Sequence, residues 1–145
     1  MRGLGVKGAE MHATAGSNRK SLLSVTGALE AATGLALLAM PSVVVELLLG
    51  AVPGTPAGVT VSSVALFALG VVCWLAREDA ASRAAKGLVA AMLLYNVAVV
   101  AVLVLAWMGP GPVGIGFWPV VLAHAGLAAW CVAGMATPTL EERRS

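Results

Sequence analysis

The chain has 145 residues, of which 59% are hydrophobic and only 11% are charged. Its mean hydropathy of +0.92 excludes an ordinary soluble domain, because so few polar residues cannot cover one. The net charge is only +2 and no basic stripe is interleaved with aromatic residues, so we expect no nucleic-acid partner. The composition therefore indicates an integral membrane protein.

The first twenty residues are polar, mixed in charge and rich in Gly, Ala and Ser. This composition predicts a poorly ordered tail over residues 1–20. Met11 is an alternative start. We expect no cleavable signal peptide, because the first apolar run is long, contains Glu30 and lacks a small-x-small cleavage site.

Four apolar runs follow the tail, each long enough to cross about 30 Å of hydrocarbon as a helix of roughly 20 residues. They cover Leu22–Met40, Gly58–Ala76, Gly87–Met108 and Phe117–Ala136. Only helices or closed barrels satisfy the backbone in lipid, and continuous apolarity favours helices. We expect an all-α, integral membrane four-helix bundle over 21–136, with successive spans running up-down-up-down and a polar tail over 137–145.

A short apolar segment separates the first two runs. It begins after Pro41, ends at Gly50 and carries one carboxylate, Glu46. It is too short to span a membrane, so we expect an interfacial helix of about two turns with Glu46 facing water. Two interpretations stay open: a connector lying on lipid, and a lid over a site.

All nine Lys and Arg residues lie on one side of the membrane when the chain is threaded through it four times. Cationic residues near a span resist translocation, so this asymmetry predicts orientation. We expect a multi-pass membrane protein with both termini in the cytoplasm. The basic residues are Arg2, Lys7, Arg19, Lys20, Arg77, Arg83, Lys86, Arg143 and Arg144.

Glu30 is the leading candidate for a functional site, because a carboxylate in the middle of a span is costly unless it is protonated or paired. Thr26 and Thr33 share its helix face. One interpretation is structural: a neutral Glu30 hydrogen-bonded to another helix. The other is a proton, cation or ligand site. Beside this face, small residues allow a close helix contact, namely Gly27, Gly34, Ala28 and Ala32.

Asn96 and His124 lie at similar depths to Glu30 in their own spans, and Tyr95 is adjacent to Asn96. We predict that Glu30 faces the bundle interior with Asn96 or His124 as its nearest polar side chain from another helix. A haem would need a second axial ligand besides His124, and only His12 in the tail remains. The cofactor stays open, and no metal is expected.

Cys73 and Cys131 lie near the cytoplasmic ends of their spans and could be neighbours. Buried cysteines usually behave as small apolar residues, so we assign them no redox role. The chain contains no catalytic triad, P-loop, HExxH or CxxC motif. The sequence therefore names no catalytic residue, and the leading expectation is a protein that is not an enzyme.

One resemblance rests on apolar and small residues over most of positions 22–135. The chain is similar to small four-helix bacterial membrane proteins, and distantly to the DoxX-type families. The resemblance implies a four-helix fold in a bacterial inner membrane. The family's link to thiosulfate–quinone oxidation is not carried over, because no matching redox residues occur. The similar segments are Gly27-x-x-Glu30-x-x-x-Gly34-x-x-Leu37-Leu38-x-x-Pro41, Leu47–Gly50 and Leu69–Trp74.

Three functions remain open from the sequence. The leading hypothesis is a membrane protein without chemistry of its own, acting as an accessory subunit or as a small-ligand binder. The second is a small proton-coupled transporter that uses Glu30. The third is a membrane redox or lipid-modifying enzyme that uses His124 and the cysteines. The expected partners are membrane lipid and either a larger complex or a second copy of the chain.

Overall fold

The computed structural model describes residues 3–50, 54–109 and 114–136, with side chains from residue 16 onward. Within these residues the chain is helical and contains no strand. The elements are α1 (Gly3–Ala39), α2 (Pro41–Leu49), α3 (Pro56–Ala76), the 3-10 turn η1 (Arg77–Asp79), α4 (Arg83–Trp107) and α5 (Phe117–Met135).

Four helices in the described residues are long and apolar enough to cross a membrane. Their bounds are Gly16–Ala39, Pro56–Asp79, Arg83–Trp107 and Phe117–Met135. Each coincides with one of the apolar runs expected from the sequence. The bounds at the α1 start and at the α3–α4 connection extend beyond the expected ones by up to two turns, and the other bounds agree to within two residues. The expectation of an all-α chain with four helices long and apolar enough to cross a membrane is confirmed.

Helix α1 is much longer than the apolar run that it contains. It starts at Gly3, although the sequence predicts a poorly ordered tail over residues 1–20. No proline interrupts residues 3–20, and the last three of them contact other elements, as described below. The helix therefore continues through the polar segment. Residues 1–2 and the predicted tail over 137–145 lie outside the described part of the chain.

The short segment after α1 is a helix, as expected. Pro41 begins α2, where its missing N–H costs nothing. Gly50 ends it with φ 63°, a left-handed conformation that favours glycine, and its N–H donates to the Glu46 carbonyl at 2.8 Å. The Glu46 side chain is exposed.

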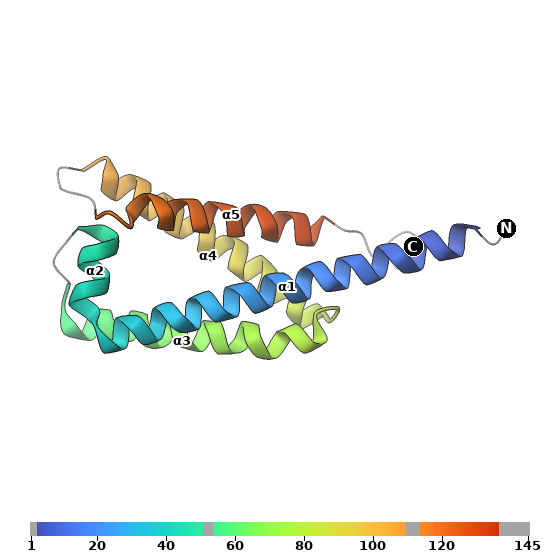
Figure 1. The fold of residues 1–145 in the computed structure, drawn as a ribbon, viewed down its shortest axis with the longest axis horizontal. Helices are drawn as coiled ribbons and strands as arrows, with labels where there is room; N and C mark the ends of the chain where they lie inside the picture. The colour runs from blue at the N-terminus through green and yellow to red at the C-terminus, as the bar shows by residue number, and fades with distance from the viewer. Residues whose placement is uncertain (1–2, 51–53, 110–113, 137–145) are drawn as a thin grey trace.

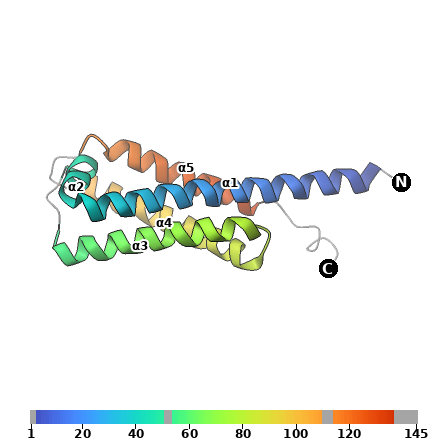
Figure 2. The same ribbon diagram turned by 60° about the horizontal axis from the view of Figure 1, so that its bottom comes forward.

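The long helices form two antiparallel pairs, α1 with α3 and α4 with α5. Successive long helices run in opposite directions, and α2 stands across one end of the bundle (Figures 1 and 2). We call this the α2 end. The opposite end is called the basic end, because it carries Arg19, Lys20, Arg77, Arg83 and Lys86. The two pairs meet near the basic end and diverge toward the α2 end (Figure 1).

Glycines bring α1 and α3 into backbone contact. A Cβ added to Gly34 would lie 2.6 Å from the Phe67 nitrogen, and one added to Gly70 would lie 2.5 Å from the Ala31 nitrogen. Gly27 faces α3 as well. Lipid is as apolar as a leucine side chain, so helices in membranes associate through this close packing. The glycine part of the predicted small-residue face is confirmed.

The alanine part of that prediction is wrong. Ala28 and Ala32 are exposed, and Ala31 makes the contact with α3 instead. A helix advances 100° per residue. Ala28, one residue after Gly27, and Ala32, two residues before Gly34, therefore lie off the face that these glycines share.

The main core lies in the half of the bundle nearer the basic end. Its buried residues come from α1, α3, α4, α5 and the turn after η1: Leu22, Leu23, Cys73, Ala80, Ala85, Val89, Met92, Leu127 and Cys131. A smaller cluster of Leu103, Phe117 and Val121 joins α4 to α5 near the α2 end.

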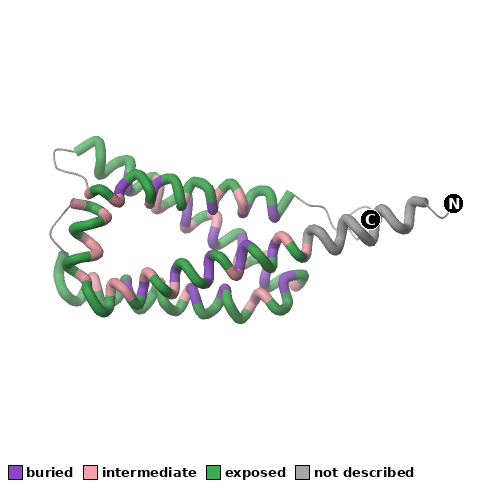
Figure 3. Tube along the Cα trace, viewed as in Figure 1, coloured by how far each residue is buried: buried purple, intermediate pink, exposed green. Residues whose placement is uncertain are grey.

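The outer surface of the spans is apolar. Along each long helix, short buried stretches are separated by exposed ones (Figure 3). Among the exposed side chains are Leu94 at 71%, Leu105 at 67% and Leu122 at 68%. Contiguous apolar surface of this kind is unfavourable in water and favourable in hydrocarbon, in agreement with four membrane-crossing helices.

Arg19 is buried at the basic end. It is only 5% exposed, and its guanidinium donates to the Ala80 carbonyl at 2.7 Å and to the Gly134 carbonyl at 3.3 Å. The neighbouring Asn18 accepts a hydrogen bond from the Trp130 indole at 2.7 Å. These contacts join α1 to α5 and to the turn before α4.

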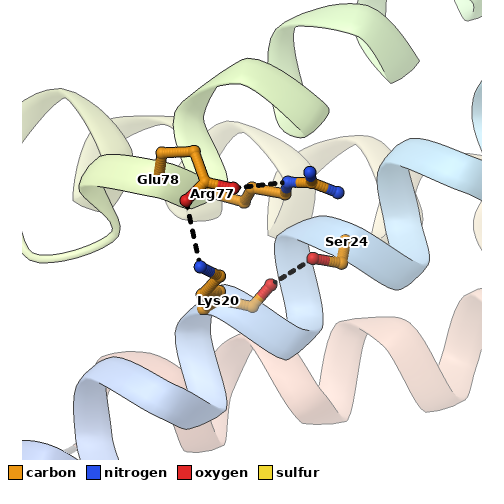
Figure 4. A network of polar contacts seen from close by, with 4 residues as sticks. All are labelled: Lys20, Ser24, Arg77 and Glu78. Carbon is orange, nitrogen blue, oxygen red and sulfur yellow. Dashed lines mark hydrogen bonds and ion pairs between the residues drawn. The ribbon is translucent and has the colours of Figure 1, made fainter.

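An exposed ion-pair network joins α1 to η1 at the basic end (Figure 4). The Lys20 ammonium is 3.0 Å from Glu78, whose other oxygen is 3.0 Å from the Arg77 guanidinium. The Arg77 guanidinium also stacks on the Trp74 ring, 3.4 Å from its centroid. Because the charges are solvated, this network stabilises the fold little.

Candidate functional site

A cavity of about 920 Å³ lies between the two helix pairs in the half of the bundle nearer the α2 end. All four long helices and α2 contribute to its wall, and most of the lining side chains are aliphatic. The lining residue of α1 nearest the basic end is Leu29, with Glu30 next to it, and on α4 and α5 the corresponding residues are Tyr95 and Leu127. These positions form the floor, where the main core begins.

Glu30 lies on the cavity floor and is 4% exposed, so the prediction that it faces the interior is confirmed. Its direct partner differs from the prediction. The Tyr95 hydroxyl donates to Glu30 Oε2 at 3.4 Å, a long hydrogen bond, instead of Asn96 or His124. The partner still comes from α4, one position away from Asn96.

Asn96 bonds His124, which lies across from it on α5. His124 Nδ1 is 2.7 Å from Asn96 Oδ1, and Asn96 Nδ2 donates to the Met92 carbonyl at 2.7 Å. The Tyr95 ring meets the His124 ring edge-on, with centroids 5.7 Å apart. Adjacent residues of α4 therefore turn to different partners, and a continuous set of contacts runs from Glu30 through Tyr95 and His124 to Asn96.

Of the two predicted threonines, only one lines the cavity. Thr33, one turn from Glu30 toward the α2 end, lines the cavity. Thr26 is 1% exposed and lies on the core side of the floor, outside the lining. Asn96 is fully buried behind His124 and does not line the cavity either. Of the predicted site residues, those that a ligand in the cavity can contact are therefore Glu30, Thr33, Tyr95 and His124.

Helix α2 forms the wall at the far end of the cavity through Val44, Val45, Leu48 and Leu49. It is fixed to the segment before α5, where the Gly116 N–H donates to the Leu47 carbonyl at 2.9 Å. A Cβ on Gly114 would overlap the same carbonyl. Of the two interpretations of this segment, the lid over a site agrees with this geometry.

The cysteines lie away from the cavity. Cys73 and Cys131 are both fully buried members of the main core, as expected for neighbours. Among the described residues, no group of three or more His, Cys, Asp and Glu side chains could hold a metal ion. The His12 side chain, considered as a haem ligand, lies outside the described side chains.

Sequence reasoning missed the contacts of Asn18 and Arg19, because both were assigned to the tail. Two signals point to them in retrospect. They lie one turn before Leu22, where a helix that enters the membrane can continue backward. Trp130 lies near the end of its span, and a partly buried indole N–H in an apolar helix requires an acceptor.

No family model, curated protein or solved structure matches the chain. The resemblance to DoxX-type proteins therefore stays a prediction, and the function is argued from the site alone.

Proposed function

We propose that the protein binds a small lipophilic ligand in the cavity between its helix pairs. The observation that carries this proposal is a cavity of about 920 Å³ with aliphatic walls and a polar floor. Small-molecule sites usually have volumes of about 300–1,000 Å³ and combine apolar walls with a few polar groups. The walls suit an apolar body, and Glu30, Tyr95 and His124 suit one polar end.

We further propose that the four helices lie in a bacterial inner membrane with the basic end at the cytoplasm. In support, the basic side chains of α1, η1 and α4 gather at that end, and the described α2 end carries only Glu46 as a charged side chain. Helix α2 then lies at the outer interface and closes the cavity from that side. The bacterial origin rests on the resemblance.

Proton-coupled transport through Glu30 is the second candidate, because Glu30 lies on the cavity floor. A carrier must also open at the basic end. There, backbone contacts at Gly27 and Gly70 and the buried bonds of Arg19 join the helices, which favours a binder. Proton-linked uptake of a ligand by liposomes containing the protein would favour the carrier. Association with a larger complex or a second copy stays a prediction.

The test uses pyrenebutanol, an apolar ring system with one hydroxyl, as the probe. The protein is placed in lipid nanodiscs, and energy transfer from tryptophan to pyrene is measured during titration. Trp107 and Trp118 meet edge-on near the α2 end, with ring centroids 5.6 Å apart, and serve as donors. We expect saturable binding to the wild type.

A matched pair of variants separates cavity binding from partition into lipid. Ala123→Phe fills the cavity, which Ala123 lines. Ala129→Phe, on the same helix, adds the same ring at an exposed position outside the lining. Saturable transfer should be lost in the first variant and kept in the second. Equal transfer in both variants, or none in the wild type, would contradict ligand binding.

A further inference from the structure

The floor of the cavity contains an imidazole whose tautomer is fixed by its neighbour. Asn96 Nδ2 must face the Met92 carbonyl at 2.7 Å, because that carbonyl can only accept. The Asn96 oxygen therefore faces His124 Nδ1, also at 2.7 Å. An oxygen of an amide accepts, so His124 Nδ1 carries the hydrogen. In the neutral ring, the lone pair is then on Nε2.

This lone pair faces the cavity. His124 Nε2 has no hydrogen-bond partner among the described residues. Every fully buried side-chain N or O atom of those residues has a partner, so Nε2 cannot be fully buried. Nε2 is therefore accessible, and the accessible space that His124 borders between the helix pairs is the cavity. A ligand in the cavity meets Nε2 as a hydrogen-bond acceptor.

Glu30 presents a second acceptor from the opposite helix pair. Its Oε2 receives the Tyr95 hydroxyl, whereas Oε1 has no partner among the described residues and, by the same criterion, is accessible. Glu30 is the only acidic residue in the described lining, and no Lys or Arg lines the cavity there to neutralise it. A lone carboxylate in hydrocarbon is costly unless a cation accompanies it.

We propose that the ligand has a protonated primary amine at its polar end, which donates to the Glu30 carboxylate and to His124 Nε2. This inference rests on the proposed ligand-binding function and defines its substrate class as an amphiphilic amine. The ammonium neutralises the Glu30 carboxylate and donates a second N–H to His124 Nε2. The aliphatic walls between the floor and α2 hold the apolar body.

The test compares three probes that share one ring system: pyrenebutylamine, its trimethylated quaternary form and pyrenebutanol. Energy transfer from tryptophan is measured in nanodiscs of neutral lipid, for the wild type and for Glu30→Gln. The amine has charge and N–H donors, the quaternary form has charge alone, and the alcohol has neither charge nor an N–H. We expect the amine to bind about 10-fold more tightly than each of the others.

In Glu30→Gln, the preference for the amine over the alcohol should fall close to one-fold. Equal affinity for the three probes in the wild type would overturn the amine proposal while leaving ligand binding intact. Equal affinity for the amine and its quaternary form would overturn the role of N–H donation. A preference for the amine that is retained in Glu30→Gln would overturn the pairing of the ammonium with Glu30. If that variant does not fold, the three probes on the wild type still decide.

Discussion

The two ends of the bundle are built on different principles. Nearer the basic end, Gly27 lets the backbones of α1 and α3 touch, and Arg19 and Asn18 bind partners across helices. At the α2 end, the helix pairs diverge around a cavity of about 920 Å³. In hydrocarbon, apolar burial does not drive helices together, so close packing and buried polar contacts must do so. The basic end therefore carries stability and leaves the α2 end free for a ligand.

The largest effect should come from Gly70→Leu, because a Cβ at Gly70 would lie 2.5 Å from the Ala31 backbone nitrogen. Overpacking of this kind should reduce the free energy of unfolding by about 3 kcal/mol. The measurement is reversible unfolding in mixed micelles with increasing SDS. The control is Gly126→Leu, since nothing lies within 4 Å of a Cβ there. Equal losses in both variants would contradict the close contact of α1 with α3.

A core truncation should have the next largest effect. Met92 is 1% exposed in the main core, and Met92→Ala should cost about 2 kcal/mol of unfolding free energy. The cost is at the low end of the usual range, because transfer from core to lipid contributes little. Leu66→Ala removes side-chain volume at the cavity wall and should cost clearly less in the same titration. A similar loss for Leu66→Ala would show that the cavity is packed like the core.

The third effect concerns the two basic residues at the membrane entry of α1. Arg19→Met removes a buried charge-assisted hydrogen bond to the Ala80 carbonyl and should cost about 1.5 kcal/mol of unfolding free energy. Lys20→Met removes an exposed ion pair and should leave unfolding nearly unchanged. The reverse order of the two variants would contradict the role of Arg19.

The smallest effect is expected on the cavity floor. Tyr95→Phe removes one long hydrogen bond, 3.4 Å from oxygen to oxygen, and should cost about 0.5 kcal/mol or less of unfolding free energy. The same SDS titration measures it. A loss as large as that of Met92→Ala would show that the Glu30–Tyr95 contact holds the bundle together and would favour the structural interpretation of Glu30.

The spans and the short helix were predictable, because each rests on a signal local in sequence. Continuous apolarity of about 20 residues defines a membrane-crossing helix. Pro41 and Gly50 define the ends of α2 in the same local way. The continuation of α1 through residues 3–20 was not predictable from composition, since it depends on partners such as Ala80 and Trp130 that are distant in the chain.

The site was predictable in its members but not in their pairing. An ionisable residue in a span must face the interior, so Glu30 could be placed from the sequence. Its partner depends on the rotation of α4, and one residue changes the direction of a side chain by 100°. That rotation pairs Tyr95 with Glu30 and Asn96 with His124. The cavity itself depends on how the helix pairs diverge, which no local pattern records.

Two neighbouring serines on α3 test the cavity most directly, because one lines it and the other packs against α1. Ser62 lines the cavity, whereas Ser63 is fully buried where α3 packs on Gly34 of α1. Cysteine is nearly isosteric with serine, so Ser62→Cys and Ser63→Cys probe the two environments with little disturbance. The wild type is the baseline, because Cys73 and Cys131 are fully buried.

The measurement is the rate of reaction of each cysteine variant with methyl methanethiosulfonate in nanodiscs, with and without pyrenebutylamine. Ser62→Cys should react at least about 10-fold faster than Ser63→Cys, since a buried thiol is inaccessible. The amine should slow the reaction of Ser62→Cys alone. Equal rates for the two variants, or a Ser62→Cys rate that the amine leaves unchanged, would contradict a ligand cavity at the α2 end.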